Sequence, residues 1–417
     1  MQYQFTSTFL LAAAGLLGSS AVQAQEPARS ADVVEASVAL IDDPLAEAHL
    51  ELLELAHRTA AKMPLEPHIK NRARAEERVV SACLAVDQPA LARRYVEGIP
   101  NWRKGAGFAD IAAYAVESGQ KEAVGPLLAL AVAEAEAAAA SPNAQDWRPA
   151  RIRGKIARVH ALLGDFERAL EFEQGLDLTE AGQVDGVRVR FLAAEDFDGK
   201  VVTLLAMAKD ATFEEVQRAL ASFAQLHERF YTDEARRTRL EEAVIEASAK
   251  MPAQIRISTW MTMAENALGQ GDQEHARVLI DRTRKLVDEG RWPARTHVPT
   301  LARLASLRHR AGQEGLAEGI LQGALAMFEA SLGEIADFHR TDALLPVAEA
   351  HVDRGDSESA RAIYDRCLVE LSKNPNARVR TDDLVDLCCS MVRKGVTANP
   401  EFRERLARAS DLMQAPW

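Results

Sequence analysis

Apolar residues recur along most of the chain with the spacing of an α-helix, and they do so in pairs of neighbouring stretches. The clearest pair covers residues 251–288, with a break at Gly271. Before the break, the residues on one helical face are Ile257, Trp260, Met261, Ala264 and Leu268. After it, they are Ala276, Leu279, Ile280, Thr283 and Val287. The pattern predicts a helix, a tight turn and a second helix, each with an apolar face that it cannot bury alone.

The same arrangement of a proline, a small residue, a glycine and an apolar residue returns along the chain. Its copies are Pro100, Ala112, Gly119, Val124; Pro142, Ala157, Gly164, Ala169; Pro252, Ala264, Gly271, Ala276; Pro293, Ala305, Gly312, Ala317; and Ala348, Gly355, Ala360. Degenerate copies are Pro67, Val79, Val86, Leu91 at the start and Pro375, Cys388, Gly395 at the end. Proline suits the first turn of a helix, and glycine supplies the positive φ that ends one. The Asp that follows three of the glycines is a good N-cap for the second helix. The chain is therefore predicted to be a repeat array.

The order small–x6–Gly–x4–Ala resembles the tetratricopeptide repeat family, most clearly in residues 163–170 and 355–364. This resemblance covers residues 67–175 and 252–400. It implies an all-α fold, a right-handed α-solenoid of antiparallel helix pairs, whose usual partners are proteins or peptides. Neighbouring turn glycines lie 40 to 45 residues apart, which exceeds the family's period of about 34, so longer helices are expected. Most of the family's Trp and Tyr positions carry other residues.

The pattern also divides the chain into segments. We expect a signal peptide over 1–24, a leader and capping helix over 25–66, helix pairs over 67–176, an irregular helical insert over 177–250, helix pairs over 251–400, and a C-terminal capping helix over 401–417. Residues 9–17 form the apolar core of the signal, and Val22-Gln23-Ala24 is its cleavage site. The insert has room for one or two further pairs, and its strand-like stretch 184–194 is assigned to a helix.

The signal predicts an exported protein, most simply periplasmic in a bacterium, with no membrane insertion after cleavage. Formal net charge is −12, which disfavours nucleic acid and anionic membranes as partners. Four cysteines are too few for a disulfide scaffold. Cys388 occupies a small-residue position and is interpreted as a buried thiol, although Cys367 could reach Cys388 or Cys389.

No catalytic, cofactor or metal site is predicted. The chain has no HExxH, GxSxG, Walker or GxGxxG-after-strand motif. Its ten histidines are scattered, and His49 and His57 lie two turns apart on one helix. Ordinary surface or interface histidines are the simpler interpretation.

Basic residues lie eight or nine positions before the small residue in most copies. They are Lys70, Arg103 with Lys104, Arg148, Arg256, Arg340 and Arg380, while His297 takes the place in one copy. Positive charge at a helix N-terminus opposes the helix dipole, so a partner is expected. One explanation pairs each with a carboxylate on the neighbouring helix. The other is a basic ladder that binds acidic segments. Trp102 and Trp147 precede two of these arginines and either contact a ligand or fill the gap between units.

The leading functional expectation is an exported, non-enzymatic scaffold that binds a protein or peptide. The alternative is an accessory protein of an envelope or cell-wall enzyme system that binds glycan or the enzyme, and a hydrolase comes third. The Lys and Asn with which tetratricopeptide domains clamp a terminal carboxylate are missing. The matching positions in three copies are Ala109 and Ala113, Met261 and Glu265, and Ala302 and Ser306. These residues predict a comparatively apolar inner groove suited to an amphipathic helix.

Overall fold

The computed structural model describes residues 40–142, 145–176, 178–209 and 211–417. Residues 38–417 form one compact unit. The predicted signal peptide over 1–24 and most of the leader lie outside the described residues. Within them every regular element is a helix, and no residue is assigned to a strand. This confirms the all-α class.

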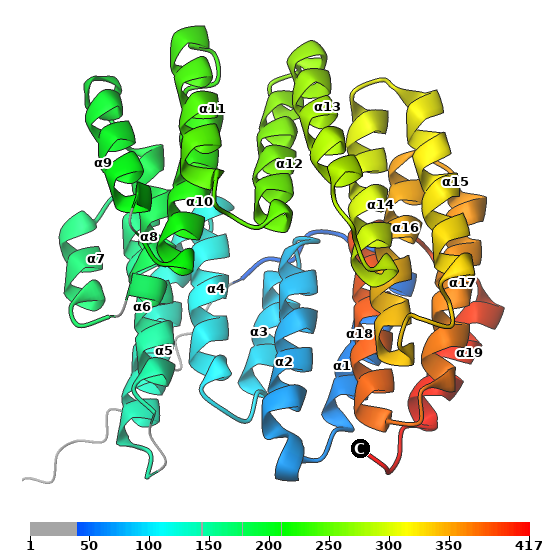
Figure 1. Cartoon of the computed structure of the whole chain (residues 1–417). Helices are drawn as coiled ribbons and strands as arrows, with labels where there is room; N and C mark the ends of the chain where they lie inside the picture. Colours follow the sequence, from blue (N-terminus) through cyan, green and yellow to red (C-terminus); the bar gives the residue numbers. More distant parts are fainter. Residues whose placement is uncertain (1–39, 143–144, 177, 210) are drawn as a thin grey trace, which may run out of the picture. The chain divides into compact units, whose positions relative to one another are not determined.

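The described helices follow one another with short connections (Figure 1). In the first half they are α1 (Glu47–Ala61), α2 (Leu65–Leu84), α3 (Pro89–Glu97), α4 (Arg103–Glu117), α5 (Val124–Ala140), α6 (Trp147–Leu162), α7 (Phe166–Glu173), α8 (Leu178–Arg190), α9 (Phe197–Lys209) and α10 (Phe213–Arg229). In the second half they are α11 (Glu234–Ser248), α12 (Ala253–Gly269), α13 (Gln273–Glu289), α14 (Ala294–Arg310), α15 (Glu314–Ala330), α16 (Arg340–Asp353), α17 (Ser357–Lys373), α18 (Ala377–Arg393) and α19 (Pro400–Asp411). Short 3-10 turns η2 (Lys121–Ala123), η3 (Ala194–Asp196) and η4 (Asp337–His339) lead into α5, α9 and α16.

The helices fall into two series that alternate along the chain. The even-numbered helices α2 to α18, here called the A row, each pack against the next member of the row. Each odd-numbered helix from α3 to α17 except α9 packs against the A-row helix before it, and most also pack against the one after it, whereas α9 packs against α10 and α11. An array of antiparallel pairs in which neighbours bury each other's apolar faces is an α-solenoid, as the repeat pattern predicts.

The repeat markers occupy the positions that their chemistry predicts. The side chains of Ala112, Ala157, Ala264, Ala305 and Ala348 are all completely buried. The six turn glycines Gly119, Gly164, Gly271, Gly312, Gly355 and Gly395 all have positive φ, between 65° and 80°. The side chains of Asp165, Asp272 and Asp356 cap α7, α13 and α17 by accepting from backbone N–H groups. Pro252 and Pro293 stand one residue before their helices rather than inside the first turn.

The segment 177–250 continues the array. It contains α8, α9, α10 and α11, of which α10 and α11 form a pair, α9 packs against both of them, and α10 packs against α8 and α12. The strand-like stretch 184–194 belongs largely to α8, in agreement with the helix assignment. The repeat pattern is weak in this segment because other residues take the place of the turn glycines. None of its described residues is a glycine with positive φ.

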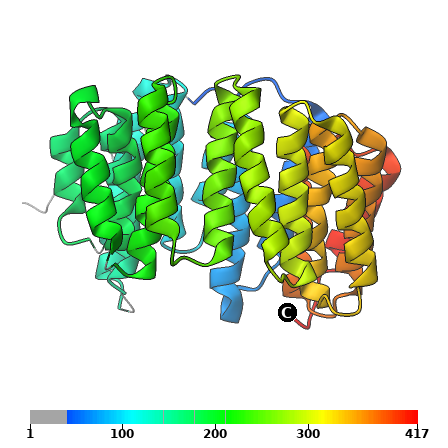
Figure 2. The ribbon, with the colours of Figure 1, turned by 45° about the horizontal axis from the view of Figure 1, so that its top comes forward.

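The array closes on itself, since α18 packs against both α1 and α2. Helix α1 packs against α18 in the way that the other odd-numbered helices pack against their A-row partners. A helix from the start of the chain therefore completes the last helix pair, that of α18. Figure 1 shows α1 beside α18, and Figure 2 again shows blue helices from the chain start next to the orange helices of its end. The two predicted capping helices therefore meet. Lys62, just after α1, pairs with Asp411 at the end of α19, with Nζ 3.1 Å from Oδ1.

Helix α5 is unusually apolar. With η2 it forms a stretch, Lys121–Ala140, that is long and apolar enough by length and composition to cross a membrane. One face of α5 is buried through Val124, Leu127 and Ala131 against α4 and α6. The other face owes its hydropathy largely to alanine.

All four cysteines are buried free thiols. Cys367 does not pair with Cys388 or Cys389, and Cys388 has the structural role that its repeat position predicts. Burial raises the pKa of the Cys389 thiol to about 12, which keeps it protonated and unreactive at neutral pH.

Candidate functional site

Three of the predicted basic residues pair with carboxylates inside the chain. Arg103 is buried and places Nε 3.0 Å from Oε2 of Glu77 on α2. Lys104 places Nζ 3.1 Å from Oε1 of Glu134 on α5. Arg340 pairs with the fully buried Glu370 on α17 at 3.3 Å. These contacts are the kind that the first of the two explanations expects.

The remaining members of the series have varied surroundings. Arg380 donates to the carbonyls of Asn374, at 2.7 Å, and Pro375, at 2.9 Å. The guanidinium of Arg148 lies 5.7 Å from the centre of the Trp147 ring. The side chain of half-buried Arg256 has no hydrogen bond or ion pair to another described residue. The series does not share one environment, and a role for it in partner binding stays a prediction.

The two tryptophans meet at the junction of two units. Trp102, just before α4, packs edge-on against Trp147, the first residue of α6, with ring centres 5.2 Å apart. Trp102 is buried, whereas Trp147 keeps 41% of its surface exposed. The guanidinium of Arg103 stacks over the Trp102 ring at 4.5 Å. The pair fills the gap between units, and Trp147 alone offers an accessible aromatic face.

The positions expected to line an apolar groove do not line it. Ala109, Ala113, Met261 and Ala302 are buried between helices. Ser306 donates to Asp353, and Glu265 pairs with Arg303. The expectation of an apolar inner groove at these positions is wrong, because in units this long they face neighbouring helices.

A cleft does run along the A row, one segment further on, across α6, α8, α10 and α12. It consists of two adjoining cavities of about 660 and 270 Å³ that share Gln225 and Glu228 of α10. The first is lined by Arg158, Gly186, Val187, Arg190, Gln225, Glu228 and Arg229. The second is lined by Gln217, Leu220, Ala221, Ala224, Gln225, Glu228, Ile255, Ser258, Thr259, Thr262 and Asn266. We call these two cavities the A-row groove, because only A-row helices line them.

The first cavity is positively charged within an acidic protein. Arg158, Arg190 and Arg229 line it, against a single carboxylate, that of Glu228. Arg190 pairs with Glu117 at 3.0 Å, and Arg229 donates from Nε to the carbonyl of Leu192 at 3.0 Å. The side chain of half-buried Arg158 has no hydrogen bond or ion pair to another described residue, so its guanidinium is available to a ligand. Several donors that converge on one cavity suit carboxylates.

The end of the Gln225 side chain lies against Gly186 in the groove. A Cβ at position 186 would lie 2.2 Å from Nε2 of Gln225, closer than atoms can approach. Gly186 therefore lets the Gln225 side chain cross between α8 and α10.

A signal for this groove was present in the sequence at one position. The residue directly after the small residue is where the tetratricopeptide clamp carries a polar group, and after Ala157 it is Arg158. Arg190 and Arg229 lie in the segment where the repeat markers are missing, so no repeat position predicted that they would line the groove.

The described residues also include one group of side chains that could hold a metal ion. His227 on α10, Glu241 on α11 and His275 on α13 bring their ligand atoms within 4.8 Å of one another. No two of these residues share a helix, so sequence spacing could not reveal the group.

Similarity to known proteins does not identify the fold of this chain, which is established by the helices described above. No family model matches the chain. No curated protein matches it either. A solved structure described as a "circular tandem repeat protein with novel repeat topology and enhanced subunit contact surfaces" aligns with 87% of this chain and 94% of its own, at 15% identity and a TM-score of 0.28.

Proposed function

We propose that this protein is an exported, non-enzymatic scaffold of tetratricopeptide-like helix pairs that binds an acidic segment of a partner protein in the A-row groove. The observation that supports it is the convergence of Arg158, Arg190 and Arg229 on one cavity of about 660 Å³. Export rests on the predicted signal over residues 1–24. A mature N-terminus at Gln25 would support it.

The charges of the groove favour an extended acidic peptide. Arg158 offers its donors without an internal competitor, and Arg190 is exposed enough to exchange Glu117 for a ligand carboxylate. Arg229 is held in place by the Leu192 carbonyl at the end of α8, where a cation is favoured by the helix dipole. Charge-assisted contacts of this kind weaken as salt screens them.

The adjoining second cavity favours a segment with apolar residues beside its acidic ones. It is lined by Leu220, Ala221, Ala224 and Ile255 among hydroxyl and amide groups. A peptide that spans both cavities would place carboxylates over α6 and α8 and an apolar side chain between α10 and α12.

The test is the binding of fluorescein-labelled peptides that alternate glutamate with leucine, compared with lysine-containing counterparts, measured by anisotropy at low and high salt. We expect the acidic peptide to bind the full mature chain and Arg158→Glu or Arg190→Glu to weaken binding at least about tenfold. Arg239→Glu is the matched control, because it changes net charge equally on α11, outside the groove.

Equal affinities for the Arg158→Glu and Arg239→Glu variants would contradict a binding site in the groove. Binding of cell-wall glycan in place of the acidic peptide, with loss on Trp147→Ala, would instead support the accessory role in an envelope enzyme system.

A further inference from the structure

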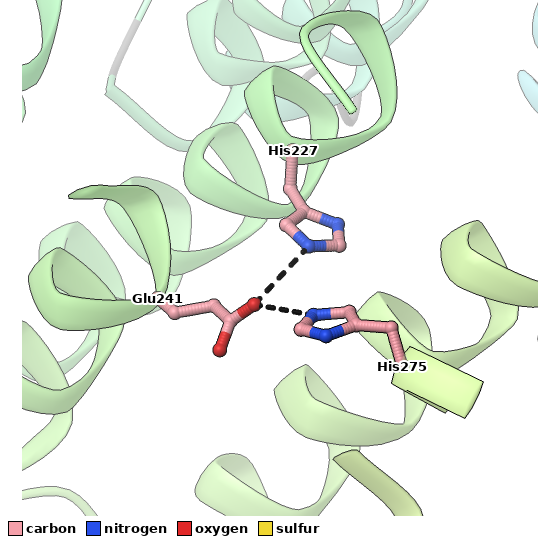
Figure 3. A group of neighbouring side chains, drawn as sticks. All are labelled: His227, Glu241 and His275. Atoms are coloured by element: carbon pink, nitrogen blue, oxygen red, sulfur yellow. Dashed lines mark hydrogen bonds and ion pairs between the residues drawn. The ribbon is translucent and has the colours of Figure 1, made fainter. Parts of the chain in front are cut away.

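The cluster of His227, Glu241 and His275 joins three helices from two neighbouring units. Glu241 lies between the two rings, with Oε1 2.6 Å from Nε2 of His275 and 3.9 Å from Nε2 of His227 (Figure 3). α10 and α11 form one pair, and α13 belongs to the next. The three ligand atoms point toward a common centre.

His227 is the unusual member of the group. It is completely buried, and its Nε2 has no hydrogen-bond partner although it is directed at the cluster. Leaving a buried polar nitrogen unpartnered is costly, so such an atom requires an explanation.

From these observations we propose that His227, Glu241 and His275 form a binding site for one zinc-class divalent ion. Two imidazoles and one carboxylate are ligands that Zn²⁺ accepts, at bond lengths of about 2.0–2.2 Å. Tetrahedral geometry then places ligand atoms roughly 3.3 Å apart. The ion would enter between Glu241 and His275 and separate them, while His227 moves closer, so each observed distance changes by less than about 1 Å.

The fourth position belongs to water. The side chains of Glu241 and His275 keep 14% and 20% of their surface exposed, so solvent reaches the site. Oε2 of Glu241 faces Arg282, with Nη1 3.8 Å away, which leaves Oε1 as the single coordinating oxygen. Arg282 is itself stacked over Trp260 at 4.4 Å.

The remaining groups around the cluster define its charge and its second shell. Arg237 pairs with Asp272, at 3.7 Å, and Tyr231 donates to the same carboxylate at 2.9 Å, so neither competes for Glu241. Asn266 donates to the carbonyl of Ala224 and lies 3.4 Å from Nδ1 of His227. With the ion on Nε2, Nδ1 would carry the proton, and Asn266 could accept it through its amide oxygen only by giving up its bond to the Ala224 carbonyl.

The bound ion would fasten the joint between two units directly behind the A-row groove, because Asn266 also lines that groove. This inference does not depend on the groove's ligand, and it concerns the stability of the joint between units.

The experiment measures Zn²⁺ binding to the full mature chain by competition with a chromophoric chelator, and the spectrum of the Co²⁺ form. We expect one ion per chain, a d–d spectrum of tetrahedral intensity, and a higher Tm with zinc. Glu241→Gln and His275→Gln should each weaken binding at least about 30-fold. Arg282→Gln should tighten it several-fold, because the guanidinium charge opposes the ion.

His351→Gln is the matched control. His351 also faces a carboxylate, with Nδ1 3.0 Å from Oδ2 of Asp356, but no third ligand joins them among the described residues. It should bind zinc as the wild type does, and circular dichroism of every variant checks that it is folded. Zinc binding that is weaker than 100 µM, or that survives both Glu241→Gln and His275→Gln in folded protein, would overturn the proposal.

Discussion

Two junctions in this molecule join A-row helices by different means. The junction of α14 with α16 lies inside the array and is packed mainly with apolar side chains, with the buried Ala305 and Ala348 among them. The closure, where α18 meets α1 and α2, is crossed by ion pairs. Arg78 on α2 reaches Asp382 and Asp386 on α18, each at 2.6 Å. Thr59 and Ser410 share a hydrogen bond of 2.7 Å between their hydroxyl groups.

The difference follows from sequence separation. Neighbouring units are joined by short connections, so bringing them together costs little chain entropy. Ion pairs such as Arg103–Glu77 add to their apolar packing. The Arg78–Asp382 contact spans 304 residues, and bringing such distant segments together costs more chain entropy. Any A-row helix could in principle meet a free edge of the array. Directed charge pairs select the correct partner and register, which apolar surfaces alone do less well.

The largest expected effect is at the internal junction. Ala305→Glu places a carboxylate where the methyl group is completely buried, so we expect a loss of roughly 4 kcal/mol or more in the free energy of unfolding. Urea denaturation followed by circular dichroism measures it. Ala326→Glu on α15, at an exposed position, should change stability by less than about 0.5 kcal/mol. Similar losses in the two variants would show that the internal packing is not as tight as described.

A second effect concerns the pKa values of two buried carboxyl groups on α18, the helix that meets α1 and α2 at the closure. Burial raises the pKa of Asp383 on α18 from 3.8 to about 8, and that of Asp386 to about 6. The folded state therefore holds protons that the unfolded chain releases above pH 4. The contribution of these protonated carboxyl groups to the free energy of unfolding is complete below about pH 4. It is lost as pH rises through the pKa values that the two groups have in the folded state. For Asp383 alone the loss between pH 5 and pH 7 is about 3 kcal/mol.

Asp383→Asn should flatten this slope and raise the Tm at pH 8, measured by differential scanning calorimetry across pH 5–8. Asp411→Asn, at an exposed position on α19, should leave the slope unchanged. A wild-type protein that becomes more stable from pH 5 to pH 8, with Asp383→Asn parallel to it, would contradict a protonated buried Asp383.

The smallest effect compares two ion pairs across A-row junctions. Arg78→Ala removes the shared partner of Asp382 and Asp386 at the closure, and we expect about 2 kcal/mol of destabilisation because both pairs are partly buried. Arg303→Ala removes an exposed pair with Glu265 between α14 and α12 and should cost less than about 0.5 kcal/mol. Equilibrium unfolding of both variants decides between them. If Arg303→Ala costs as much, charge pairing would not distinguish the closure from the interior.

The candidate sites show where prediction from sequence stops. Arg158 stood at a recognisable repeat position, and the capping aspartates and turn glycines were identified from local pattern alone. Arg190 and Arg229 lie in the segment without markers, so their convergence with Arg158 had no signature. The cluster of His227, Glu241 and His275 draws one residue from each of three helices, and the 3.6-residue period that relates positions on one helix does not extend to another.

The helices, their pairing into repeated units, the glycine turns and the buried alanines could all be predicted from the amino-acid sequence. These features depend on φ preferences and on apolar periodicity within about 40 residues, which the chain carries locally. The closure of the array, the arginines that share a groove and the side chains that meet at the proposed metal site became visible in the folded chain alone. Those outcomes depend on the small rotation between successive units, accumulated over the whole array, and no single repeat encodes that sum.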